Sequence, residues 1–346
     1  MKLSMISFTR KGALTSVNLY NKLIERGYEC SNYAMEKYCD SKSLIPLKET
    51  LKKWTEREFK SSEGLIFIGA CGMAVRAFAP FITIKTKDPA VIVIDELGKY
   101  AISVLSGHIG GANELAEAIG EMIGAEPVIT TATDINNKFS VDVFAKKNNL
   151  FIFSMLIAKD ISAAVLEDEE IGFSSDVSFN GELPCYLSSK GDCRYGIRIS
   201  LNDREKPFER TLNLIPRTIT IGLGCRKGKS FKEIESFILD KLKDMNISIH
   251  SVVRVASIDV KKNEEGLLEF CDKYHIEKVF YTSEELDNIE GEFTKSDFVK
   301  KVVKVDNVCE RAAVLGSGYG ELLLKKYAKN GITMAIADKK GRINFE

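Results

Sequence analysis

The segment 106–114, SGHIGGANE, contains residue types suited to acid–base chemistry on an anionic ligand. His108 can give or take a proton near neutral pH. The neighbouring glycines would let a ligand approach backbone N–H groups, and a helix N-terminus favours anions. The residues expected to bind or orient a ligand here are Ser106, Gly107, Gly110, Gly111, Asn113 and Glu114. The alternative is a tight turn with a surface histidine before a helix whose first turn favours Glu.

A strand-to-helix turn earlier in the chain offers a second set of ligand groups. Gly72 and Arg76 follow the predicted strand 64–70. Arg76 is either a carboxylate clamp beside segment 106–114 or a solvated charge. Another predicted strand end carries hydroxyls and a carboxylate, which either bind a ligand or only end the strand with an Asp cap: Thr131, Thr133 and Asp134.

A predicted loop before the strand at 90–94 holds two more candidates. Lys85 would bind an anionic substrate. Asp88 either takes part in catalysis or only starts the turn with Pro89.

Segment 222–228, GLGCRKG, is a glycine-rich loop in the second half of the chain. Its glycine spacing fits neither a dinucleotide fingerprint nor a P-loop. Gly224 and Arg226 are candidate ligand-binding residues, because the loop precedes a helix N-terminus. Cys225 has no histidine near it in sequence, which favours a packing role over a nucleophile. Glu310 is either a surface charge on a helix or a substrate-binding carboxylate at the same sheet edge.

Short apolar runs bounded by glycine predict the strands that position segment 106–114. The run 64–70 predicts a buried strand. The runs 90–94 and 100–105 are separated by turn residues and predict a hairpin. Helical periodicity over 112–123 follows, and 127–133 predicts the next strand.

A second alternation of strands and helices begins at Thr218. Ser230 and Glu233 predict a capping box that opens a helix. We therefore predict an α/β fold: two mainly parallel βα-alternating domains joined by a smaller α+β middle region. The further elements predicted here are strands at 218–223, 252–258, 279–282 and 332–337 and helices at 264–274, 296–303 and 308–315, and the expected domains are 1–134, 135–216 and 217–346.

The composition excludes several classes of protein. Lys+Arg and Asp+Glu are each 49 in 346 residues, so a nucleic-acid partner is not expected. No apolar run approaches the roughly 20 residues that span a bilayer, and the start lacks the pattern of a signal peptide. The eight cysteines form no C-x-x-C pair and there are three histidines, so no metal site is expected. Scattered single cysteines fit a cytoplasmic protein.

Taken together and in this order, these segments resemble the cobalt-precorrin-5A hydrolase family of anaerobic cobalamin biosynthesis. The strongest match covers about residues 64–134, through GLIFIGACGMAVR, DPAVIVIDE followed by LSGHIGGAN, and PVITTATD. A looser match covers TITIGLGCRKGKS, VASIDVKKNEEGLLEF and ITMAIA in the second half. The first 60 residues and the middle region match only by position.

The resemblance implies a hydrolase that opens the ring-A δ-lactone of cobalt-precorrin-5A and releases acetaldehyde to give cobalt-precorrin-5B. Cobalt would arrive with the substrate, so no cofactor of the protein's own is implied. The partner would be the cobalt-corrinoid itself. Contacts with neighbouring cobalamin-pathway enzymes and a homodimer are left open by the sequence.

Lactone hydrolysis needs a base and an oxyanion stabiliser. We assign His108 as base, with Glu114 as a second proton acceptor, and the N–H groups of Gly110 and Gly111 as oxyanion donors. A cleft between the two α/β domains would hold the macrocycle. Two alternatives remain: a corrinoid-binding or channelling protein without its own chemistry, and a phosphate- or nucleotide-dependent α/β enzyme.

Overall fold

The computed structural model describes residues 1–84, 87–136, 138–189, 191–295 and 305–345. These residues form two compact units, Met1–Val143 and Phe144–Glu346, and each is considered by itself. Lys85 and the helix predicted at 296–303 lie outside the described residues. No described helix is both long enough and apolar enough to cross a membrane.

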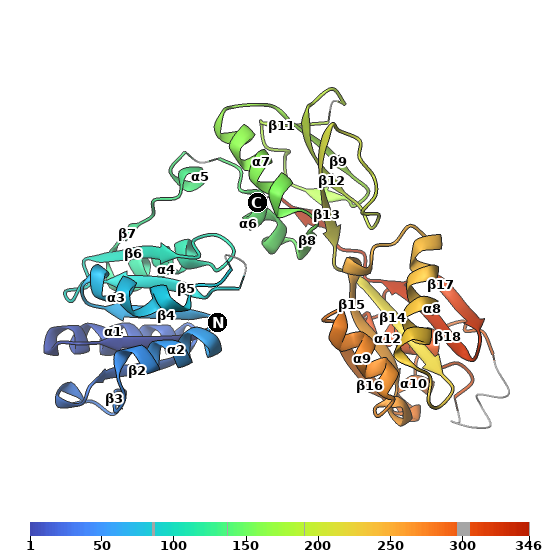
Figure 1. Ribbon diagram of the computed structural model, residues 1–346, viewed down its shortest axis with the longest axis horizontal. Coiled ribbons are helices and arrows are strands. Elements are labelled where there is room, and N and C mark those ends of the chain that lie inside the picture. Colours follow the sequence, from blue (N-terminus) through green and yellow to red (C-terminus); the bar gives the residue numbers. More distant parts are fainter. Residues whose placement is uncertain (85–86, 137, 190, 296–304, 346) are drawn as a thin grey trace. The chain divides into compact units, whose positions relative to one another are not determined.

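Unit 1 is built on a seven-stranded sheet with strand order β3-β2-β1-β4-β5-β6-β7 (Figure 1). Its strands are β1 (Lys2–Ser7), β2 (Glu29–Met35), β3 (Ile45–Leu47), β4 (Gly64–Ile68), β5 (Ala90–Ile94), β6 (Tyr100–Leu105) and β7 (Glu126–Val128). Its helices are α1 (Arg10–Glu25), α2 (Leu51–Ser61), α3 (Cys71–Phe78), α4 (Ala112–Ile123) and α5 (Ala132–Ile135), with 3-10 turns η1 (Glu36–Tyr38) and η2 (Ala79–Phe81). Helix α6 (Val141–Lys147) begins in unit 1 and ends in unit 2.

Both faces of this sheet are covered, which explains why its central strands are apolar throughout. One face packs under α1 and α4, where Leu19 and Ile119 meet Ile66 and Ile92. The other packs under α2 and α3, where a fully buried tryptophan, Trp54, lies in the cluster. The runs predicted at 64–70 and 90–94 are thus confirmed as buried strands.

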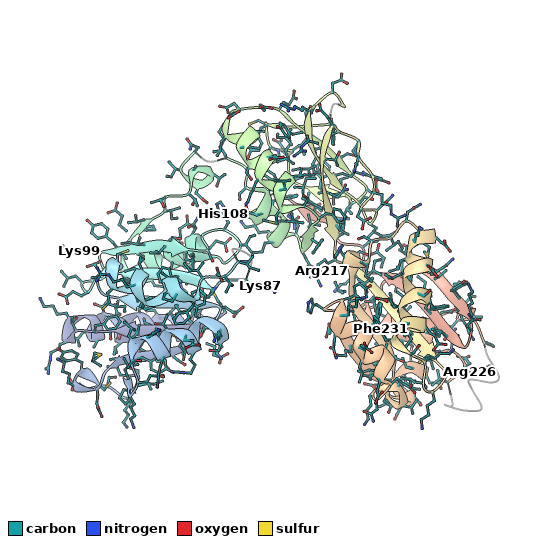
Figure 2. The ribbon with its side chains drawn as sticks, in the orientation of Figure 1. Lys87, Lys99, His108, Arg217, Arg226 and Phe231 are labelled. Carbon is teal, nitrogen blue, oxygen red and sulfur yellow. The ribbon has the colours of Figure 1, made fainter. Side chains whose placement is uncertain are left out.

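The direction of β6 determines which loops lie at the same edge of the sheet. The predicted hairpin is confirmed: β5 and β6 are antiparallel, with Val91 opposite Leu105 and Ile94 opposite Ala101. All other neighbouring pairs in the sheet are parallel. The end of β6 therefore lies at the edge where β4 and β5 begin, not where they end. Figure 2 shows the same arrangement, with His108 and Lys87 at one end of the sheet and Lys99 at the other.

The strand predicted at 127–133 is shorter than expected. It ends at Val128, and residues 132–135 form the short helix α5. Since β7 runs parallel to β6, its end reaches the same edge as the end of β6.

Unit 2 contains a mainly parallel sheet of order β11-β9-β12-β13-β8 over the middle of the chain, with α7 packed on it. Only the β13–β8 pair is antiparallel. The elements are β8 (Leu150–Ile152), α7 (Met155–Leu166), β9 (Ile171–Ser175), β11 (Leu187–Ser188), β12 (Tyr195–Ile199) and β13 (Arg210–Pro216). A two-stranded pair joins β10 (Phe179–Asn180) to the C-terminal β19 (Ile343–Asn344).

The second sheet of unit 2 has the order β16-β15-β14-β18-β17, parallel through β14, β15 and β16 and antiparallel beyond. Helices α8 and α9 cover one face and α12 the other. The predicted capping box of Ser230 and Glu233 is confirmed at the start of α8. The elements are β14 (Ile219–Cys225), α8 (Phe231–Asp244), η3 (Ile249–Ser251), β15 (Val252–Ile258), η4 (Asp259–Lys261), α9 (Glu265–Lys273), β16 (Glu277–Tyr281), α10 (Ser283–Asp287), α12 (Cys309–Gly316), β17 (Glu321–Lys329) and β18 (Ile332–Asp338).

Candidate active site

The turn between β6 and α4 is so tight that side chains larger than glycine do not fit at some of its positions. Ser106 has a positive φ of 58° and Gly111 one of 83°. A Cβ on Gly110 would lie 2.3 Å from the Ser106 Cβ, and a Cβ on Gly107 would lie 2.7 Å from Asn113 Oδ1. Packing thus explains much of the glycine pattern that the sequence suggested was for ligand approach.

One predicted oxyanion donor is already used by the turn itself. The Gly111 N–H donates to the His108 carbonyl at 2.9 Å, and the Ala112 N–H donates to the Ser106 carbonyl at 3.1 Å. The assignment of the Gly111 N–H as an oxyanion donor is therefore wrong for this conformation. Gly110 is the remaining candidate of the pair.

His108 lies between two carboxylates. Its Nε2 is 2.7 Å from Asp134 Oδ2 and 3.0 Å from Thr133 Oγ1. Its Nδ1 is 3.4 Å from Asp142 Oδ2. The side chains of His108 and Asp142 are each 10% exposed, whereas that of Asp134 is 36% exposed. The imidazole is thus held on both sides, with Asp134 on the more open one.

This setting favours the protonated imidazole. Asp142 and then Asp134 raise the pKa of His108 above its ordinary value, against the opposing effect of burial. Burial acts to raise the pKa of Asp134, but hydrogen bonding to Thr131 and His108 lowers it overall. The base predicted from the sequence is therefore better suited, in this structure, to donate a proton than to accept one.

Asn113 links the turn to the segment after β7. Its Nδ2 donates to Thr131 Oγ1 at 2.8 Å and to Asp134 Oδ2 at 3.1 Å. Its Oδ1 accepts from the Ser103 hydroxyl at 2.7 Å. Thr131, Thr133, Asp134 and His108 are thus brought together, because β6 and β7 end at one edge of the sheet.

Asp142 contacts His108 directly, yet the sequence did not predict it as a site residue. It lies in the first turn of α6 and also accepts from the Val143 N–H at 3.1 Å. An acidic residue in a first helical turn is explained by the helix dipole alone. No pattern in the sequence therefore distinguished Asp142 from an ordinary helix-start carboxylate.

The carboxylate of Asp88 is occupied by hydrogen bonds within its own loop. The Thr83 N–H donates to its two oxygens at 3.0 and 3.1 Å, and the Thr83 hydroxyl donates to Oδ1 at 2.7 Å. Its carbonyl accepts from the Ser106 hydroxyl at 3.0 Å. Asp88 is only 5% exposed, so the structure favours the turn alternative over the catalytic one.

Gly72 and Arg76 do not join the His108 cluster. Both are exposed on α3, which follows the end of β4. Because β6 is antiparallel to β5, this edge is the opposite one from segment 106–114. The expectation that Arg76 lies beside that segment is wrong. Glu114, by contrast, is exposed in the first turn of α4, next to the turn.

The three candidates of unit 2 occupy different environments. Gly224 lies in β14, and Arg226 is exposed just beyond it (Figure 2). Glu310 is fully buried, and its carboxylate accepts from the Thr294 and Lys326 N–H groups at 2.9 and 2.7 Å. Its oxygens therefore tie backbone segments together rather than face a ligand.

The glycine-rich loop after β14 already holds a carboxylate of its own chain. The Gly228 N–H donates to Glu264 Oε2 at 3.0 Å, and Lys261 pairs with Glu264 Oε1 at 2.9 Å. The Gly228 N–H and the Lys261 ammonium, which could otherwise bind an anion, are thus already used by Glu264. Within the described ranges, no group of three or more His, Cys, Asp or Glu side chains is arranged to hold a metal ion.

Three family descriptions match consecutive parts of the chain. Cobalamin synthesis G N-terminal matches residues 53–134, which include His108 and Asp134. Cobalamin biosynthesis central region matches 139–216, which include Asp142. Cobalamin synthesis G C-terminus matches 219–337.

The chain is similar to known proteins over most of its length. It is 36% identical over 297 residues to a cobalt-precorrin-5A hydrolase of Priestia megaterium, covering 81% of this chain and 79% of that protein. It is 31% identical over 312 residues to a cobalt-precorrin-5A hydrolase of Salmonella typhimurium, covering 85% and 87%. Among solved structures, a cobalamin biosynthesis protein G homolog from Sulfolobus solfataricus is 24% identical over 97% of each chain, with a TM-score of 0.44.

Proposed function

Because the chain belongs to the cobalt-precorrin-5A hydrolase family, we propose that it hydrolyses cobalt-precorrin-5A in cobalamin biosynthesis. Water opens the ring-A δ-lactone, and acetaldehyde leaves to give cobalt-precorrin-5B. The cobalt is part of the substrate, and the protein contributes acid–base groups and donors.

The observation that carries the chemistry is the imidazole of His108 held between Asp134 and Asp142. Two neighbouring carboxylates stabilise an imidazolium, which is a proton donor at neutral pH. His108 is therefore the general acid of lactone opening. The more exposed Asp134 is the partner that substrate displaces when the ring oxygen approaches Nε2.

The proton can be used twice. When water adds to the lactone carbonyl, His108 gives its proton to the ring oxygen that leaves, and the added water loses its proton to a neighbouring base. Our candidates for that base are Asp134, 2.7 Å from His108 Nε2, and Glu114, which is exposed in the first turn of α4. The new hydroxyl then returns its proton to neutral His108 as the C–C bond breaks. The bonding electrons pass into the macrocycle, and the two-carbon fragment departs as acetaldehyde.

Substrate binding uses the donors around this cluster. The Gly110 N–H is the oxyanion donor, and Ser106, Gly107, Asn113, Thr131 and Thr133 shape the turn that presents it. Lys87 is exposed on the loop that precedes β5 at the same edge, where a cation would meet substrate carboxylates. Lys85, predicted from the sequence to bind substrate, stays a prediction.

The direct test is an anaerobic assay of the purified protein with cobalt-precorrin-5A, measuring acetaldehyde. We expect acetaldehyde in amounts equal to the substrate consumed. A change in corrinoid absorbance without acetaldehyde would favour a binding or channelling protein instead. A nucleotide that raises the melting temperature would favour the nucleotide-dependent alternative.

A further inference from the structure

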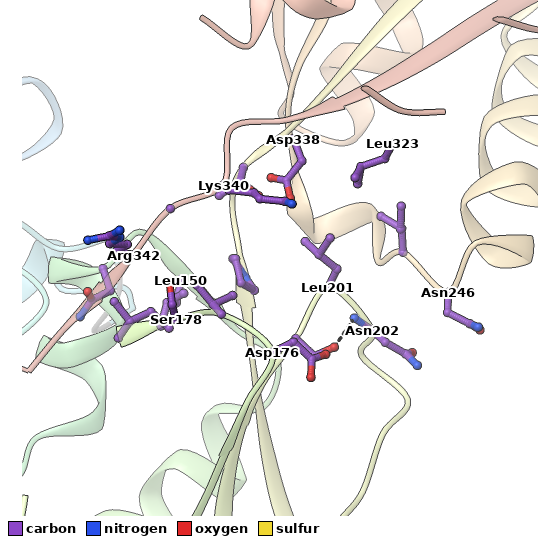
Figure 3. Close-up of a pocket in the computed structure, with 18 of the residues that line it drawn as sticks. Leu150, Asp176, Ser178, Leu201, Asn202, Asn246, Leu323, Asp338, Lys340 and Arg342 are labelled. Atoms are coloured by element: carbon purple, nitrogen blue, oxygen red, sulfur yellow. Dashed lines mark hydrogen bonds between the residues drawn. The ribbon is translucent and has the colours of Figure 1, made fainter. Parts of the chain in front are cut away.

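A cavity of about 720 Å³ lies in unit 2, where the sheet of β8–β13 meets the residues after β18 (Figure 3). Its wall is partly apolar, through Leu150 and Leu201, and its Asp176 carboxylate is already paired with Arg198 at 2.6 Å. The acid–base groups of the proposed reaction belong to unit 1 instead. There, two side chains with no proton to transfer converge on Asp134.

Asp134 needs further support to stay beside His108. Its side chain is 36% exposed, and it lies on α5, a helix of only four residues. Asp142, by contrast, is 10% exposed, and its Oδ1 also accepts from the Val143 N–H at 3.1 Å. Because an ion pair in contact with water contributes little by itself, the position of Asp134 depends on its other contacts.

Asn113 provides that support. Its Nδ2 donates at 3.1 Å to Asp134 Oδ2, the same oxygen that lies 2.7 Å from His108 Nε2. Nδ2 also donates at 2.8 Å to Thr131 Oγ1, on the residue that precedes α5. Asn113 is 6% exposed and belongs to the first turn of the twelve-residue helix α4. A buried amide on a well-supported helix thus holds the more exposed carboxylate of the pair.

Ser103 determines which end of the Asn113 amide faces Asp134. An ionised carboxylate only accepts hydrogen bonds, so it must meet Nδ2 rather than Oδ1. The Ser103 hydroxyl, on β6, donates to Asn113 Oδ1 at 2.7 Å and satisfies the amide in that orientation. Gly107 closes the other side, because a Cβ there would lie 2.7 Å from Oδ1 and 3.1 Å from Nδ2. The amide therefore has one orientation that satisfies both of its ends.

We propose that Ser103 and Asn113 are positioning residues, which keep Asp134 next to His108 before and after the substrate takes its place at Nε2. Their part in the reaction rests on the proposed function. When the lactone ring oxygen approaches Nε2, the Asp134 carboxylate loses one donor but keeps the Asn113 Nδ2 donor. It therefore stays close enough to take the proton of the attacking water, which favours Asp134 over Glu114 as the base.

The first measurement needs no substrate. The chain has three histidines, so NMR can follow the His108 imidazole of the full chain through a pH titration, with His108→Gln identifying its signals. The charged groups that face this imidazole are Asp134 from α5 and Asp142 from α6. Ser103→Ala and Asn113→Leu should weaken only the contact with Asp134, so the pKa of His108 should fall in both. Ser103→Thr keeps the hydroxyl and should restore it.

The second measurement is acetaldehyde release from cobalt-precorrin-5A. Asn113→Leu should lower kcat by roughly 10- to 100-fold, the cost of a small misplacement of a reacting group, with KM nearly unchanged. Ser103→Ala should lower kcat by about 2- to 10-fold, as expected for one neutral hydrogen bond, and Ser103→Thr should recover it. Ser162→Ala is the matched control. It removes a half-buried hydroxyl that donates to the Ala158 carbonyl at 2.9 Å in unit 2, and should change neither measurement.

The two measurements separate this inference from the proposed function. If the unchanged protein releases no acetaldehyde, the proposed function fails, and the titration alone then tests whether Ser103 and Asn113 hold Asp134 against His108. A His108 titration that is the same in Ser103→Ala, Asn113→Leu and the unchanged protein would overturn the inference. So would a loss of kcat that Ser103→Thr fails to recover, or a loss matched by Ser162→Ala.

Discussion

Replacing Asp142 by Asn should lower the pKa of His108 and so shift its imidazole toward the neutral form. At the 3.4 Å separation of Nδ1 and Oδ2, the direct attraction is about 5 kcal/mol for an effective dielectric constant of about 20. Desolvation cancels part of it, and hydrogen bonds to charged groups have net values of about 1.5–3 kcal/mol. Losing that amount lowers the ratio of protonated to neutral His108 by roughly 10- to 150-fold.

The assay is acetaldehyde release as a function of pH. A general acid loses activity as pH rises through its pKa, so the alkaline decline of kcat/KM should move to lower pH in Asp142→Asn. Corrinoid binding should change little. Melting temperature should fall at acidic pH, where Asp142 is paired with the imidazolium, and change little at alkaline pH, so a general folding defect would be recognised as a loss at every pH. An unchanged profile, or a uniform loss at every pH, would refute the assignment of His108 as an acid held by Asp142.

Three further predictions concern stability. The pKa of His108 is raised on folding, so its ion pairs stabilise the protein fully below the unfolded pKa of about 6.5, and this stabilisation is lost as pH rises through the folded pKa. In denaturant melts, His108→Gln should have a lower free energy of unfolding than the unchanged protein, and the difference should shrink at alkaline pH. A difference that stays constant with pH would contradict the ion pairs. Gly110→Ala should lower the free energy of unfolding by about 1–3 kcal/mol, because its Cβ would lie 2.3 Å from the Ser106 Cβ. Gly72→Ala is the matched control: nothing lies within 4 Å of its Cβ, so this variant should be neutral or slightly stabilised. Equal unfolding free energies for the two variants would count against the turn geometry. Glu310→Gln should cost about 1.5–3 kcal/mol in denaturant melts, because the Thr294 and Lys326 N–H groups lose a charged acceptor; an unchanged midpoint would mean that those bonds do not form.

Local patterns in the sequence predicted the elements well, because glycine-bounded apolar runs and a capping box have few alternatives. The predicted hairpin is confirmed, and it determines which edge of the sheet each loop reaches. An antiparallel β6 places segment 106–114 at the edge opposite Arg76, and the same reasoning brings Thr131 and Asp134 to His108 through the parallel β7.

What the sequence did not reveal depends on tertiary contacts. The contact of Asp142 with His108 joins residues 34 positions apart, and the neighbours of Asp142 in sequence explain it equally well as a helix start. Glu310 is a charged residue on a predicted helix, and residue type alone favours a surface position, but packing of α12 buries it completely. The glycines of segment 106–114 suggest close approach of a ligand, but contacts with Ser106 and Asn113 already require two of them.

The central claim is that His108, held by Asp134 and Asp142, transfers the proton in this reaction. The most direct measurement is anaerobic acetaldehyde release from cobalt-precorrin-5A by His108→Ala, compared with the unchanged protein at equal corrinoid binding. The account predicts a loss of about 10²- to 10⁴-fold in kcat with substrate binding retained. Near-normal release of acetaldehyde by this variant would contradict it.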